Sequence, residues 1–307
     1  MPETPPEELE FLEAFDHCLV GLVLRLVAGP LRPLFKLDPT WKPAYTKVHK
    51  FVDRNVQIAL DRQREFAKTG KDPEKEGERK KYILLHQMAM DNQDALYLRA
   101  QIINVFFPAR DTSALAIGNV MFEMARRPDV WEELRAEVAA IGDQKLTFEL
   151  IKDLKYAKAI ISETLRLHVP GTRILRIALK DTVLPVGGGP DQQSPLWVAK
   201  GTIIEMDLYA MHRNPKIWGD DAEEFKPSRW APGRPLWEAK RQYSPFIGGI
   251  RICPAQQMVL AQLTYLIVRL AQEFKTIENK DPVYRYVEEI KMTVESRNGT
   301  KIAVVRA

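Results

Sequence analysis

Apolar residues recur with the period of an α-helix through much of the first half of the chain. Two such stretches, residues 9–27 and 45–66, predict amphipathic helices that each bury one face. A longer helix is predicted over about 94–126, and its middle, residues 102–107, is apolar on nearly every side. We therefore expect this helix to cross the interior, with a kink at Pro108, whose ring removes a backbone donor.

Three more helices are predicted from the same kind of pattern. They cover residues 127–142, 149–168 and 256–274, and Pro128 occupies the position that opens a helix. Between the second and third helices of the chain, residues 68–81 carry alternating charges together with Gly and Pro. This composition predicts a solvated connecting loop.

The pattern changes after residue 168, where short runs of β-forming residues alternate with turn residues. These runs predict strands over residues 173–178, 196–198 and 202–206. Near the end of the chain, Asn298-Gly299 predicts a β-hairpin because this dipeptide suits a two-residue hairpin turn. Its strands would be residues 289–295 and 301–305.

The predicted fold class is mainly α with a small β component. No internal repeat and no sharp change of composition divides the chain, so we interpret residues 1–307 as a single domain. Within it, residues 1–168 are expected to be mostly helical, including the long central helix, and residues 169–307 to be mixed α/β.

Composition and charge exclude several classes of protein. The net charge is only +4 and the basic residues are dispersed, so nucleic-acid binding is not indicated. The two cysteines, Cys18 and Cys253, cannot form a disulfide framework and fit a reducing compartment. No apolar run reaches the ~18 residues of a transmembrane helix, and the acidic, Pro-rich start is not a signal peptide. The histidines show no metal-ligand spacing.

The richest chemical pattern lies in residues 244–255, which lead straight into the last predicted helix. Cys253 is expected at or near the N-terminus of that helix, where backbone N–H groups favour a thiolate. Gly248 and Gly249 permit positive φ and a close approach of the backbone to a flat ligand. This arrangement can present one sulfur axially to a metal, although a lone cysteine is also found as a small buried apolar residue.

The spacing of Phe246, Gly249, Arg251 and Cys253 resembles the haem-binding loop of the cytochrome P450 family. The chain has Ala255 where that family usually has Gly, and Ile247 where it usually has a small or polar residue. The resemblance implies that these four residues bind haem b (iron protoporphyrin IX) and that Cys253 is the axial ligand of its iron. A thiolate in that position favours cleavage of the O–O bond.

Glu163 and Arg166 lie three residues apart and share one face of a predicted helix. Taken alone, they would form an exposed ion pair of little energetic value. Downstream, the segment over residues 225–230 reads Phe-x-Pro-x-Arg-Trp and contains Arg229. Both segments resemble motifs of the same family and follow its order, which implies that Glu163, Arg166 and Arg229 form a buried triad beneath the haem loop.

Two further pairs acquire roles through this resemblance. Asp111 and Thr112, inside the long helix, look like an acid–alcohol pair that delivers protons during dioxygen activation. Without the resemblance, they would be polar residues bonded to the preceding helical turn. Arg176 and Arg251 resemble basic residues that pair with the haem propionates, and arginine suits carboxylates. Either arginine could otherwise be an ordinary surface residue.

Residues 180–191 and 209–213 look like a fungal branch of the family that hydroxylates n-alkanes and fatty acids. The implied function is a monooxygenase that inserts one oxygen atom from O2 into a C–H bond of an apolar substrate, at or near the chain end. Electrons would come from NADPH through NADPH–cytochrome P450 reductase. The resemblance also implies contact with the endoplasmic reticulum membrane.

The chain looks like the C-terminal portion of such an enzyme, because strands and helices that begin the family's fold are not recognisable in it. The alternative is therefore a truncated, catalytically inactive remnant or a partner-binding fragment. We expect apolar faces that are normally covered to be exposed as large patches. We also expect weak haem retention and aggregation when the chain is expressed alone.

Overall fold

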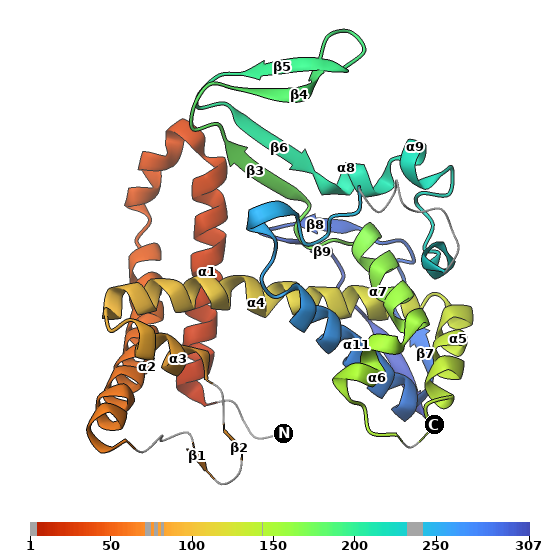
Figure 1. Ribbon diagram of the computed structural model, residues 1–307, viewed down its shortest axis with the longest axis horizontal. Coiled ribbons are helices and arrows are strands. Elements are labelled where there is room, and N and C mark those ends of the chain that lie inside the picture. Colours follow the sequence, from red (N-terminus) through yellow and green to blue (C-terminus); the bar gives the residue numbers. More distant parts are fainter. Residues whose placement is uncertain (1–4, 71–74, 77–78, 81–82, 143, 232–241) are drawn as a thin grey trace. The chain divides into compact units, whose positions relative to one another are not determined.

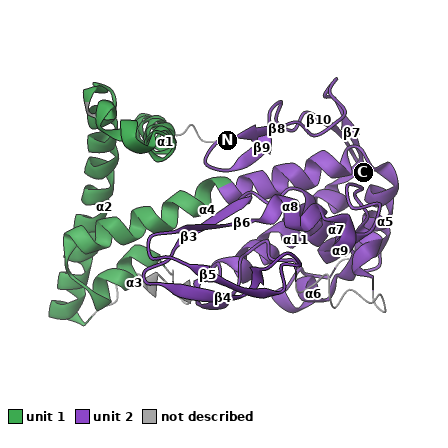
Figure 2. Cartoon of the chain, turned by 90° about the horizontal axis from the view of Figure 1, so that it is seen from above, with its two compact units in different colours: residues 1–111 green, residues 112–307 purple. Residues whose placement is uncertain are grey.

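The computed structural model describes residues 5–70, 75–76, 79–80, 83–142, 144–231 and 242–307. The chain separates into two compact units, residues 1–111 and 112–307, shown in Figure 2. Most described residues outside loops are helical, and each described sheet has two strands, so the predicted fold class is confirmed. The single-domain interpretation of residues 1–307 stays a prediction.

The first unit is built from the helices coloured red to orange in Figure 1 together with the first part of the yellow helix α4 (Ala95–Met124). Helices α1 (Pro6–Val27) and α2 (Trp41–Thr69) confirm the first two predicted helices. Between them lies η1 (Gly29–Leu37), and α3 (Leu84–Asp91) follows. The apolar faces of α1 and α2 pack together, with the rings of Phe11 and Phe51 stacked at 4.3 Å.

The predicted loop over residues 68–81 contains two short paired strands, β1 (Lys75–Glu76) and β2 (Arg79–Lys80). Residues 71–74, 77–78 and 81 lie outside the described residues. The loop prediction is therefore corrected only at the four strand residues.

Helix α4 (Ala95–Met124) confirms the long central helix and continues through Pro108 as one helix. The expectation that its middle crosses the interior is wrong, because residues 101–110 include no buried position and Val105 is 42% exposed. One side of this segment, which includes Ile102 and Phe106, packs against the core of α1 and α2. An all-apolar helix is buried only where neighbours surround it, and described residues cover this one on part of its circumference.

The second unit has a core formed by the end of α4 together with α5 (Pro128–Ala139), α7 (Lys155–Leu167) and α11 (Gln256–Glu273). The helix predicted over 149–168 is divided into α6 (Phe148–Asp153) and α7, because Leu154 between them adopts an extended backbone. The core of the second unit includes the side chains of Met124, Leu134, Ile160, Leu263 and Ile267.

The described sheets of the second unit are four antiparallel pairs. Strand β3 (Arg173–Ile177) pairs with β6 (Ile203–Asp207), and β4 (Thr182–Gly188) with β5 (Ser194–Val198). Strand β7 (Phe274–Asn279) pairs with β10 (Ile302–Arg306), and β8 (Glu288–Ile290) with β9 (Val294–Ser296). The three predicted strands are confirmed as β3, β5 and β6. Strand β4 was not predicted, because its Pro and Gly residues are typical of turns.

The predicted hairpin around Asn298-Gly299 is wrong. Residues 289–295 fold on themselves as β8 and β9, and β10 instead pairs with β7, with Val304 opposite Ile277. Ile277 is buried and Ile302 packs against the helical core. Burial of apolar surface therefore outweighs the local turn preference of Asn-Gly.

Several large apolar side chains on or beside the strands are exposed, while the presence of large exposed apolar patches stays a prediction. Trp197 on β5 is 63% exposed, and Leu179, between β3 and β4, is 86% exposed. Ile177 and Ile203 lie opposite each other in the β3–β6 pair and are 59% and 63% exposed, respectively. Patches of this kind mark interaction surfaces or favour aggregation.

Glu137 on α5 holds the N-terminus of α7. Its two carboxylate oxygens accept the backbone N–H groups of Tyr156 at 2.8 Å and Ala157 at 2.9 Å. We expect Glu137→Gln to lower the free energy of unfolding by about 1–2 kcal/mol, because an amide provides one acceptor and no charge at this helix end. Urea unfolding of Glu137→Gln measures this loss, and Glu132→Gln, an exposed position on the same helix, is the control. Equal losses in both variants would contradict the capping role.

Candidate functional site

The segment over residues 244–255 folds into a compact loop ahead of α11. Ile247 donates its backbone N–H to the Ser244 carbonyl at 3.0 Å, and Cys253 donates to the Phe246 carbonyl at 3.0 Å. A short helical turn, η3 (Gly249–Arg251), lies between these two bonds. Cys253 is half-buried and forms no disulfide, and Pro254 and Ala255 separate it from Gln256, the first residue of α11. The loop thus holds one thiol at a defined place.

The backbone of this loop contains two left-handed residues. Gly249 has φ +70°, as expected for a glycine, and Ile247 has φ +63°. The expectation for Gly248 is not met, because its φ of −141° is extended. A β-branched residue in the left-handed region costs about 1–3 kcal/mol and persists only where neighbours enforce it. A Cβ added to Gly248 or Gly249 would meet no atom within 4 Å, so the space beside this backbone is open.

A pocket of about 660 Å³ lies between this loop, the β3–β6 pair and α8 (Leu208–Arg213). Both predicted propionate partners, Arg176 and Arg251, line it, whereas Phe246 and Cys253 do not. The other lining residues are Ile174, Met206, Asp207, Leu208, Met211, Ser244, Ile247, Gly248, Gly249 and Ile250, and the Asp207 carboxylate accepts the backbone N–H of Ala210 at 2.9 Å. Arg176 donates to the carbonyl of its neighbour Leu175 at 2.9 Å, and neither arginine has an ion-pair partner within the described ranges. Cations, apolar walls and open glycine backbone fit a flat apolar group with carboxylates.

The structure brings Glu163, Arg166 and Arg229 into one buried network. Arg166 donates to both oxygens of Glu163, at 2.9 and 2.8 Å, and Arg229 Nε donates to Glu163 Oε1 at 3.2 Å. Glu163 and Arg166 are completely buried, so they are not the exposed pair of the alternative interpretation. The backbone N–H of Lys226 at 2.9 Å and the Trp230 indole at 3.0 Å complete the carboxylate's partners.

The two arginines connect this network to the segment that follows α8. Arg166 donates to the carbonyls of His212 at 2.8 Å and Ala222 at 2.6 Å. Arg229 donates to the Trp218 carbonyl at 2.9 Å and pairs with Asp221 at 2.7 Å. Hydrogen bonds from Lys226 and then from Arg229 lower the pKa of Asp221 to about 2. Forked arginine contacts of this type define geometry as well as energy.

His212, to which the sequence analysis assigns no role, is completely buried beside the Cys253 loop. Its Nε2 accepts the backbone N–H of Ser244, the first residue of that loop, at 3.1 Å. Burial, and then the charges of Arg166 and Arg213, lower the pKa of His212 to about 4, so the ring is neutral near pH 7. No periodicity or spacing pattern in the sequence marks this contact.

Acid should destabilise the folded chain through His212. Its pKa is about 4 when folded and 6.5 ordinarily, so the unfolded chain binds the extra proton between these values. The free energy of unfolding therefore falls as pH falls from about 6.5 to 4, by about 3 kcal/mol from this group, and is fully retained above that window. Denaturant unfolding of the parent chain and of His212→Gln at several pH values isolates this slope. Parallel pH profiles would contradict it.

Asp111 and Thr112 lie on α4 at the boundary between the two units. Asp111 ends the first unit, where Arg110 pairs with it at 3.6 Å and also with Asp16 of α1. Thr112 begins the second unit, and the following residue, Ser113, lines a cavity of about 310 Å³ with α11. Both side chains are half-buried, and their part in proton delivery stays a prediction.

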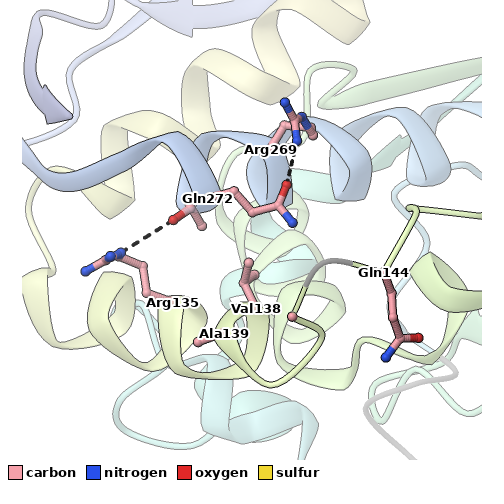
Figure 3. A pocket seen from close by; sticks show the side chains of 8 residues that line it. Arg135, Val138, Ala139, Gln144, Arg269 and Gln272 are labelled. Carbon is pink, nitrogen blue, oxygen red and sulfur yellow. Dashed lines mark hydrogen bonds between the residues drawn. The ribbon is translucent and has the colours of Figure 1, made fainter. Parts of the chain in front are cut away.

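A different pocket, of about 510 Å³, lies between α5 and the end of α11 (Figure 3). None of the predicted site residues lines it. Arg269 donates to Gln272 at 2.8 Å and pairs with Glu273 at 3.1 Å, and Arg135 donates to the Ala271 carbonyl at 3.4 Å. Because these arginines are engaged with neighbouring groups of the chain, this pocket is not the candidate site.

The described part of the chain contains no group of three or more His, Cys, Asp and Glu side chains arranged to hold a metal ion. None of its helices combines the length and the apolar composition needed to cross a membrane.

Comparisons with known proteins show to which family the sequence belongs. The family model described as Cytochrome P450 matches residues 5–299. Similar curated proteins include Cytochrome P450 monooxygenase apdE of Emericella nidulans, 36% identical over 98% of this chain and 56% of that protein. Cytochrome P450 monooxygenase fsdH of Fusarium heterosporum is 34% identical over 97% of this chain and 53% of its own. Cytochrome P450 52A12 of Debaryomyces hansenii is 35% identical over 96% and 56%. The chain thus spans about half the length of these relatives.

Proposed function

The chain belongs to the cytochrome P450 family. We propose that it acts as a haem-dependent monooxygenase on an apolar substrate. The family uses haem b and receives electrons from NADPH through a reductase. When bound, haem with a thiolate ligand supplies the chemistry that inserts one oxygen atom from O2 into a C–H bond. The observation that carries the proposal is the loop that holds Cys253 beside the pocket lined by Arg176 and Arg251.

Residues of this loop, together with Arg176 on β3, would hold the haem. Cys253 would supply the sulfur ligand to iron, and the hydrogen bond from its backbone N–H to the Phe246 carbonyl positions its main chain. Arg176 and Arg251, which line the pocket, would pair with the two propionates, because a forked cation suits carboxylates. Gly249 takes the left-handed turn that lets the backbone approach the flat group closely. Glu163, Arg166 and Arg229 hold the scaffold next to the loop.

Asp111 and Thr112 are proposed to manage protons. The Thr112 hydroxyl would hold a hydrogen bond on the substrate side of the long helix, and the Asp111 carboxylate would exchange protons with solvent. The 35% exposure of the Asp111 side chain supports this exchange. Proton transfer requires such groups to lie within hydrogen-bond reach of one another or of one water.

The substrate is proposed to be a fatty acid or n-alkane that is hydroxylated at or near its end. The resemblance of residues 180–191 and 209–213 to a fungal branch with that activity supports this choice. The proposed electron donor is NADPH–cytochrome P450 reductase, and the proposed location is the endoplasmic reticulum membrane. Both follow from the family.

Incubation of the haem-loaded chain with the reductase, NADPH, a saturated fatty acid and isotopically labelled O2 tests the proposal. We expect a hydroxylated product that carries one labelled oxygen atom at or near the chain end. A bound haem–thiolate without product would contradict the substrate class. Failure to bind haem would instead favour the alternative, a non-catalytic chain that presents its exposed apolar strands to a partner.

A further inference from the structure

We propose that His212 is a positioning residue that connects the buried Glu163–Arg166–Arg229 network to the loop that carries Cys253. This role rests on the proposed function only in that Cys253 is the ligand to iron. The contact itself is a property of the chain, and it can be tested without haem. No pattern of residues in the sequence predicts it.

The first step of the connection is the backbone of His212. Its carbonyl accepts a hydrogen bond from Arg166 Nη1 at 2.8 Å. Arg166 is itself held by both carboxylate oxygens of Glu163, and all three residues are completely buried. The main chain at His212 is therefore fixed to helix α7 by a charged donor, which makes a stronger bond than a neutral one.

The second step is the ring of His212. Its Nε2 accepts the N–H of Ser244 at 3.1 Å, and the ring lies 5.4 Å from that of Tyr243. Tyr243 donates its hydroxyl to the Ser162 carbonyl on α7 at 3.0 Å and packs on Trp230 at 4.6 Å. Trp230 in turn donates to Glu163. Two residues that enter the loop, Tyr243 and Ser244, are thus held from the same network.

The third step leads from Ser244 to Cys253. The Ser244 carbonyl accepts the N–H of Ile247, which bends the chain into the strained left-handed residue, and the Phe246 carbonyl accepts the N–H of Cys253. A strained backbone persists only where its surroundings over-determine it. The hydrogen bond that Ser244 N–H donates to His212 Nε2 supplies one such constraint at the start of the loop. The hydrogen bond that Cys253 N–H donates to the Phe246 carbonyl then fixes the main chain that carries the thiol.

A histidine suits this position because a buried neutral ring offers an unprotonated nitrogen deep inside the unit. A glutamine can place its amide oxygen where Nε2 lies, so it keeps the acceptor. Leucine has a similar volume but no acceptor, and asparagine is polar but too short to reach Ser244. These three substitutions therefore separate hydrogen bonding from packing.

The test uses the full chain with Cys18→Ser, so that Cys253 is the single thiol, and measures its rate of modification by a maleimide without haem. We expect His212→Leu and His212→Asn to raise this rate by about tenfold, the factor that corresponds to loss of one buried hydrogen bond. His212→Gln should stay close to the parent rate. Circular dichroism identifies any variant that fails to fold, and His212→Asn then decides the outcome if His212→Leu is lost.

The control is His168→Leu. His168 is the other buried histidine among the described residues, 9% exposed, and its ring bonds Glu123 at 2.6 Å rather than the loop. Its loss should leave the rate at Cys253 unchanged. Equal rates in the glutamine, leucine and asparagine variants, or an equal rise in His168→Leu, would overturn the positioning role.

A second readout separates this inference from the proposed function. After addition of haem, reduction and exposure to carbon monoxide, His212→Leu should show a smaller fraction of the red-shifted, thiolate-ligated Soret band than His212→Gln. If no variant binds haem but the thiol rates differ as expected, the proposed function fails and the positioning role stands. If haem binds and the thiol rates and band fractions do not differ, the positioning role fails alone.

Discussion

Cys253→Ala abolishes the red-shifted Soret band that the haem-loaded chain is expected to show when it is reduced and exposed to carbon monoxide. The shift depends on a thiolate bound to iron, and alanine provides no ligand. The backbone bond from residue 253 to the Phe246 carbonyl survives the substitution, because it uses the main-chain N–H. The loss should therefore be complete while the loop itself keeps its fold.

The matched control is Cys18→Ala. Cys18 lies on α1 in the first unit, it is half-buried like Cys253, and burial raises the pKa of its thiol. We expect this variant to keep the full spectral change. The absorption spectrum of each purified variant is recorded beside the parent chain. A red-shifted band in Cys253→Ala would place the iron ligand elsewhere and would remove the basis of the proposed function.

Glu163→Gln should produce the largest loss of stability among the substitutions considered for this chain. The carboxylate accepts hydrogen bonds from Arg166, Arg229, Trp230 and the Lys226 backbone, and it is completely buried. A glutamine would leave the buried Arg166 guanidinium without its counter-charge and would leave Arg229 with Asp221 as its remaining carboxylate partner. It would also turn an NH2 group toward one of the two arginines. Removal of one partner from a buried ion pair costs about 3–5 kcal/mol.

A loss of this size is comparable to the whole stability of many domains, about 5–15 kcal/mol. Chemical unfolding followed by circular dichroism measures it in the chain without haem. Glu149→Gln is the control, since Glu149 is exposed in the first turn of α6 and such a change costs less than about 0.5 kcal/mol. Similar unfolding midpoints for the two variants would mean that the network does not hold the second unit together.

The structure also explains why the sequence was informative about some parts of the site. Glu163 and Arg166 meet because residues three apart on a helix share a face, and this relation needs no tertiary contact. Cys253 stands ahead of α11 because the helical pattern from residue 256 onward is local. The contact of Arg229 with Glu163 was predicted only from the family resemblance, because the two residues lie 66 positions apart in the sequence.

Other features depend on contacts that no local pattern contains. Strand β10 leaves the Asn298-Gly299 turn and pairs with β7, because that pairing covers the helical core. The middle of α4 is apolar all round but is only partly covered by α1 and α2. The contact between His212 and Ser244 joins residues 32 positions apart in the sequence. Each depends on which surfaces the folded chain brings together.

By itself, the sequence determined the main helices, the mainly α class and two motifs. These motifs are the loop over residues 244–255 that carries Cys253, and the Glu163–Arg166 pair on one helix. Each of these is a short-range property, set by helical periodicity, by turn residues or by spacing along one element. Only the tertiary structure decided the break at Leu154, the left-handed Ile247, the strand partners and the buried position of His212. These result from the packing of distant segments, in which burial of apolar surface and pairing of buried charges outweigh local preference.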